Sequence, residues 1–176
     1  MKKFLLIALV AVLAATGGVF AYTFTTATAT IDVSSIQSDF ANITANTTYS
    51  APEVFGKYTG TWPAGGLFNI VPHGEYTGDL VIHVYLVNTG ELIRQYHHLN
   101  MTLELRDITN NPVDERGMAQ VLTLQNADVV FYFESGNSTT DDLHVALTGG
   151  GYNLHRWKTM TGGSVAPQLW CEITQR

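Results

Sequence analysis

The chain has 176 residues, a formal net charge of −6, and only 14% charged residues. This length suits a single domain with a substantial core. Nine Lys and Arg against 15 Asp and Glu argue against nucleic acid and anionic membrane as partners, because both are bound through clustered basic residues.

The first 21 residues have the pattern of an export signal. Lys2 and Lys3 precede an apolar run over 4–15, and small residues lead up to Ala21. This run is shorter than the roughly 20 apolar residues of a membrane span. We therefore predict that residues 1–21 are a signal peptide and that the mature protein is secreted, extracellular or on the cell surface, and not in the membrane. An uncleaved anchor is the alternative.

Residues 22–33 follow the predicted cleavage site directly and form a strand-like segment. Its Thr, Ile and Val favour extended backbone, and it lacks the Pro, Lys and Arg that usually protect an exposed strand edge. We expect this N-terminal strand either to be donated to a neighbouring subunit or to pair within its own sheet. The residues predicted to act in assembly are Tyr22, Phe24, Ala27, Ala29, Ile31 and Val33.

Residues 34–176 are predicted to form one β-sandwich domain. Residues 34–53 are polar and turn-rich, whereas 80–87 is the clearest strand and is largely apolar on both faces. Such a strand is expected at the centre of a sheet. We also expect it to contribute to the groove that accepts a donated strand, and we expect Asn88–Gly90 to form a turn after it.

The second half of the chain continues this pattern of short strands and turns. Residues 118–124 and 128–134 are predicted to pair around a turn, and 143–147 is predicted to be a strand that ends in a turn at 148–151. No sustained helical stripe follows the signal. The predicted fold class is therefore all-β, a two-sheet antiparallel sandwich.

The sequence offers no motif for catalysis, a metal or a cofactor. The histidines lack metal-ligand spacing, and the acidic loops 107–115 and 138–142 are interpreted as turns in preference to calcium sites. There is no Gly-x-Ser-x-Gly motif. The single cysteine, Cys171, cannot form an intrachain disulfide. We interpret it as a buried residue of the last strand, with an intermolecular disulfide as the alternative. We expect no enzyme and no cofactor.

Four sequons predict N-glycosylation in a host that has the machinery. They are centred on Asn42, Asn46, Asn100 and Asn137.

Two stretches resemble a known family. The signal end at 15–21, followed by Tyr-Thr-Phe and a Thr-rich strand, and the stretch 76–90 are similar to the TasA and camelysin group of exported fibre proteins, including the archaeal bundling pilins. The resemblance implies a jelly-roll-like sandwich that polymerises by donating its N-terminal strand. Four sequons and few lysines suit the archaeal members.

The expected function is that of a structural subunit of an extracellular filament or pilus. Polymerisation by donor-strand complementation would give a head-to-tail homopolymer, with lateral bundling, that contributes to cell adhesion or biofilm matrix. The alternative is a secreted monomeric sandwich that binds a glycan or serves a surface layer.

Overall fold

The computed structural model describes residues 27–28, 32–35, 41–46, 49, 53–54, 59–72, 78–134, 142–155 and 165–176. Its elements in chain order are β1 (Ala27–Thr28), β2 (Asp32–Ser35), β3 (Ala41–Ala45), β4 (Glu53–Val54), β5 (Thr59–Thr61), β6 (Gly65–Pro72), β7 (Leu80–Leu86), α2 (Thr89–Gln95), β8 (Tyr96–Asp107), β9 (Gln120–Thr123), β10 (Asp128–Phe133), β11 (Leu143–Leu154) and β12 (Gln168–Gln175).

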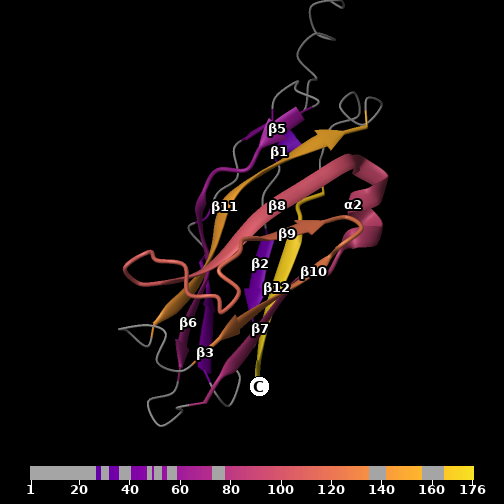
Figure 1. Ribbon diagram of the computed structural model, residues 1–176. Helices are drawn as coiled ribbons and strands as arrows, with labels where there is room; N and C mark the ends of the chain where they lie inside the picture. Colours follow the sequence, from indigo (N-terminus) through magenta and orange to yellow (C-terminus); the bar gives the residue numbers. More distant parts are fainter. Residues whose placement is uncertain are drawn as a thin grey trace, which may run out of the picture.

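Two sheets make up the body of the protein (Figure 1). The four-stranded sheet has the order β10-β7-β12-β2, and the six-stranded sheet has the order β3-β6-β11-β8-β9 with β5 beside β11. β1 pairs separately with β4. Among the described strands, β2 and β12 are the one parallel pair, and the other pairs are antiparallel.

Alternating side chains create the core between the sheets. In β7 every second residue from Leu80 to Leu86 is buried, and β8 repeats the pattern from Leu99 to Asp107. The inward residues of both sheets form one apolar cluster, as expected for a sandwich. The predicted all-β two-sheet fold is therefore confirmed.

The strands are wound as in a jelly roll. The pairs β8·β9, β7·β10 and β6·β11 nest inside one another along the chain and alternate between the two sheets. A double strand wrapped over both sheets in this way gives the jelly-roll topology.

The predicted pairing of 118–124 with 128–134 is wrong. β9 pairs with β8 in the six-stranded sheet, whereas β10 pairs with β7 in the four-stranded sheet. The residues between them cross from one sheet to the other, where Leu124 is buried and the Ala127 carbonyl accepts a hydrogen bond from the Leu86 amide (2.9 Å). Alternation of side chains shows which face of a strand is buried, but not which sheet the strand joins.

The predicted turn at Asn88–Gly90 is the start of a helix. The Asn88 carbonyl accepts hydrogen bonds from the amides of Glu91 and Leu92 (3.0 and 3.1 Å), and α2 continues to Gln95. Leu92 and Gln95 are its buried residues. Seven residues are too few for an apolar stripe to reveal a helix in the sequence.

The stretch 41–45, predicted to be turn-rich, is strand β3, with Ala41 and Ile43 in the core. The predicted turn at 148–151 is also strand, because β11 continues to Leu154. Gly150 has φ +135°, and a Cβ there would lie 2.4 Å from the Asn100 carbonyl oxygen of β8. Glycine at this position thus allows two strands to approach closely, and it does not form a turn.

This contact predicts a large difference between adjacent glycines. Gly150→Ala should lower the free energy of unfolding by about 2 kcal/mol or more, because it combines positive φ with a clash against backbone. Gly149→Ala is the matched control: a Cβ there has nothing within 4 Å, so the change should stay within about 0.5 kcal/mol. Urea unfolding measures both. Equal effects would contradict the predicted close approach.

Candidate functional site

The edges of the four-stranded sheet decide where another strand can be added. β7 pairs with β10 over residues 80–85 and with β12 over residues 80–86, so both of its edges are occupied. The strand at 80–87 was expected to contribute to the groove that accepts a donated strand. Because both of its edges are paired, it cannot form backbone hydrogen bonds with such a strand. The expectation that it is a central strand is correct.

The outer edge of β10 is closed by the loop that follows β8. The Glu115 amide donates to the Tyr132 carbonyl (2.8 Å), and the Tyr132 amide donates to Asp114 Oδ1 (3.0 Å). The Arg116 guanidinium donates to the Val130 carbonyl. The outward amide and carbonyl of Tyr132 and the carbonyl of Val130, which could pair with a further strand, are thus already used.

Two arginines hold this loop against the sheet. Arg116 and Arg176 each lie over the ring of Tyr132, with guanidinium carbons 4.7 and 5.2 Å from its centroid. Arg176 also forms an ion pair with Glu115, and Arg116 lies 3.5 Å from the buried carboxylate of Asp114. Arg176 therefore helps to close the β10 edge.

The opposite edge of the sheet is occupied by the N-terminal segment. β2 pairs in parallel with β12, with Asp32 beside Gln168, Val33 beside Leu169, and Ser35 beside Cys171 (Figure 1). The ladder covers only the first half of β12. For Glu172–Gln175 the described strands supply a partner, β7, on one side alone.

The predicted assembly residues are only partly placed by the structure. Val33 pairs with β12 of its own sheet, and Ala27 pairs with Val54 of β4. At these two positions the N-terminal segment pairs with strands of its own chain. Tyr22, Phe24, Ala29 and Ile31 lie outside the described residues.

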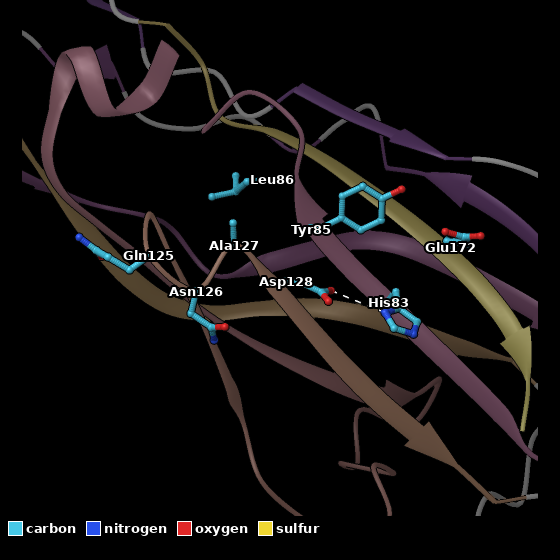
Figure 2. Close-up of a pocket in the computed structure, with 8 residues that line it drawn as sticks. All are labelled: His83, Tyr85, Leu86, Gln125, Asn126, Ala127, Asp128 and Glu172. Atoms are coloured by element: carbon cyan, nitrogen blue, oxygen red, sulfur yellow. Dashed lines mark ion pairs between the residues drawn. The ribbon is translucent and has the colours of Figure 1, made fainter. Parts of the chain in front are cut away.

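A shallow hollow of about 590 Å³ lies on the outward face of the same sheet (Figure 2). His83 and Tyr85 of β7 form its floor, with Asp128 of β10 and Glu172 of β12 on either side. The remaining lining residues are Leu86, Gln125, Asn126 and Ala127, most of them from the crossover between the sheets.

Charges surround the floor of the hollow. His83 Nδ1 lies 3.6 Å from Asp128 Oδ1, and Glu172 is the register partner of His83 on β12. Desolvation, followed by the fields of Glu172 and Asp128, raises the pKa of Tyr85. The Tyr85 side chain therefore stays a neutral phenol that can donate a hydrogen bond.

Cys171 is fully buried in β12, as its interpretation as a core residue requires. Burial, with a smaller contribution from Glu172, raises the pKa of its thiol to about 12. A neutral, enclosed thiol is a poor nucleophile and cannot reach another molecule without opening the core.

The part of the chain that the structure describes contains no group of three or more His, Cys, Asp or Glu side chains arranged to hold a metal ion. At the end of β8, Asp107 Oδ1 accepts hydrogen bonds from the Thr109 hydroxyl (2.7 Å) and the Asn111 backbone amide (2.9 Å). These contacts, that of Thr109 first, lower the pKa of Asp107. The carboxylate thus shapes its own turn.

Three sequons differ in their surroundings: Asn42 and Asn100 lie in the six-stranded sheet, and Asn46 directly follows β3. Asn42 is exposed on β3. Asn46 donates through Nδ2 to the Gly66 carbonyl (2.9 Å), and Asn100 accepts through Oδ1 from the Gly151 amide (2.6 Å). Asn137 lies outside the described residues.

These surroundings predict an order of glycan occupancy. In a host that glycosylates Asn-x-Ser/Thr, Asn42 should be modified more fully than Asn46 or Asn100, because Asn42 is exposed whereas Asn46 and Asn100 are half-buried. Glycopeptide mass spectrometry gives the occupancy of each site, and Asn42→Gln is the control. Higher occupancy at Asn100 than at Asn42 would contradict the prediction.

No protein-family model matches the chain, and no curated protein is similar to it. Within the described ranges, no helix has both the length and the apolar character needed to cross a membrane.

Proposed function

We propose that this protein is a structural subunit of an extracellular filament or pilus. It is exported, does no catalysis, and polymerises head to tail through its N-terminal strand, contributing to cell adhesion or biofilm matrix. The observation that carries the proposal is that the outer edge of β12 is filled by the N-terminal segment itself, through the short parallel strand β2.

An edge strand that pairs with one neighbour can be exchanged between copies. In the exchanged state, β2 of one subunit would pair with β12 of the next, and the same ladder would form between chains instead of within one. Exchange of an identical element has little net energetic cost, and it is a known route to assembly. The monomer, in which β2 pairs with β12 of the same chain, would then be the state before exchange.

Within the four-stranded sheet, the contacts at the β10 edge favour the β12 edge as the place where a strand is accepted. Asp114, Glu115 and Arg116 already bond to the amide and carbonyl of Tyr132 and to the carbonyl of Val130, which disfavours addition of a donated strand at β10. A donor at one place and an acceptor at another make a heterologous contact. Repeated from subunit to subunit, such a contact gives an open filament rather than a closed dimer.

The sequence of the segment is consistent with exchange. Residues 22–33 contain no Pro, Lys or Arg, so nothing in them protects against pairing with another chain. The resemblance of 15–24 and 76–90 to exported fibre proteins points in the same direction.

Removing the donor strand tests the proposal. The mature protein should form filaments under the electron microscope, and the variant lacking residues 22–33 should form none because it loses Asp32 and Val33, half of the residues that pair with β12. The matched control is Val121→Thr, which removes an exposed apolar side chain from the six-stranded sheet and should still polymerise.

A second measurement covers the case in which the shortened variant does not fold. A synthetic peptide of residues 22–35, added in excess to the unmodified protein, should shorten the filaments by occupying the β12 edge. Wild-type protein that stays monomeric at high concentration, or filaments formed without residues 22–33, would overturn the proposal.

A further inference from the structure

We propose that the hollow around Tyr85 binds a carbohydrate, specifically a neutral or amino-sugar oligosaccharide. This site is separate from the strand exchange proposed above, because it uses the outward face of the four-stranded sheet and not its edge. The proposal rests on aromatic side chains, hydrogen-bonding groups, shape and charge that meet at this place.

Two aromatic side chains lie next to each other on this face. Tyr85 of β7 and Trp170 of β12 are register partners, and both are half-buried. Side chains directly opposite on antiparallel strands have Cβ atoms about 4.5–5.5 Å apart. Tyr85 lines the hollow and offers its ring to the C–H face of a sugar and its phenol as a polar group, whereas Trp170 is not among the lining residues and lies next to Tyr85 on the neighbouring strand.

Hydrogen-bonding side chains border Tyr85. Asp128 is the register partner of Tyr85 on its other side, and Glu172 lies beside His83 (Figure 2). Gln125 and Asn126, both exposed, add amide groups from the crossover. Carboxylates accept hydrogen bonds and amides both donate and accept them, which matches the hydroxyls of a sugar.

The shape favours a chain-like ligand. The hollow is about 590 Å³, open to solvent along the sheet and bounded by the 125–127 crossover. A compact small molecule is usually enclosed on most sides by its site. An open hollow on a sheet instead suits several sugar units laid over the strands.

The charges select among carbohydrates. Asp128 and Glu172 give the hollow two carboxylates, and His83 is the basic side chain among its lining residues. Anionic sugars such as uronates, sialic acid and sulfated glycans would meet like charge, whereas neutral and amino sugars would not. The negative charge of Asp128 and Glu172 therefore disfavours binding of acidic polysaccharides.

Calorimetric titration with defined hexasaccharides tests the site. The panel contains hexamers of N-acetylglucosamine, glucosamine, β-linked glucose and mannose, with a galacturonate hexamer as the anionic member. Binding of at least one neutral or amino-sugar hexamer is expected, and no binding of the galacturonate. Tyr85→Ala should weaken binding at least about tenfold, while Tyr85→Phe, which keeps the ring, should stay within about threefold.

Two further variants keep the test decisive. Asp128→Asn should change the relative affinity for glucosamine and N-acetylglucosamine without unfolding the chain, since Asp128 is exposed, and so it replaces Tyr85→Ala if that variant fails to fold. Val121→Thr, on the other sheet, should bind like the wild type. No binding of any neutral or amino-sugar hexamer at 1 mM, or binding unaffected by both Tyr85→Ala and Asp128→Asn, would overturn the proposal.

Discussion

The pairing of β12 with β7 is the interaction on which the rest of the arrangement depends. It joins residues 169–175 to 80–86 in register and turns Leu169, Cys171 and Ile173 into the core. With β7 enclosed on both sides, the sheet can extend past β12 only at one edge, and the N-terminal segment takes that place. The same register sets Tyr85 beside Trp170 on the outward face. One ladder thus fixes both the edge proposed for assembly and the surface proposed for sugar binding.

The two sheets present different surfaces to the surroundings. The described sequons, Asn42, Asn46 and Asn100, all belong to the six-stranded sheet or its end, whereas the hollow and the β2–β12 edge belong to the other sheet. Glycans attached to the six-stranded sheet would leave the other sheet uncovered. A filament subunit needs such a division, because bulky, hydrated sugars at an assembly edge would oppose strand pairing.

Much of the fold could be predicted from the sequence, because alternation of side chains reports directly on a half-buried strand. It identified β7, the first part of β11 and the burial of Cys171. It could not show that β9 and β10 separate into different sheets, since partner choice depends on distant chain segments. The turn predicted at 148–151 was wrong for a similar reason: Gly150 lies against the backbone of Asn100 on a neighbouring strand, and no local sequence pattern shows that contact. The arginines around Tyr132 and the crossover residues of the hollow were missed because the chain brings them together only through this topology. At the candidate site, alternation placed His83 and Tyr85 on one face of a strand but could not supply their neighbours.

Exchange of β2 between subunits is tested most directly by a disulfide at the β2–β12 ladder. Asp32→Cys and Gln168→Cys are register partners, and neighbouring strands lie within the Cα spacing that a disulfide spans. Cys171→Ala removes the native thiol from the background. After oxidation of assembled filaments, a denaturing gel without reductant should show a ladder of covalent oligomers that collapses to monomer on reduction. Filaments that release only internally cross-linked monomers would show that each subunit keeps its own strand, and would contradict the account.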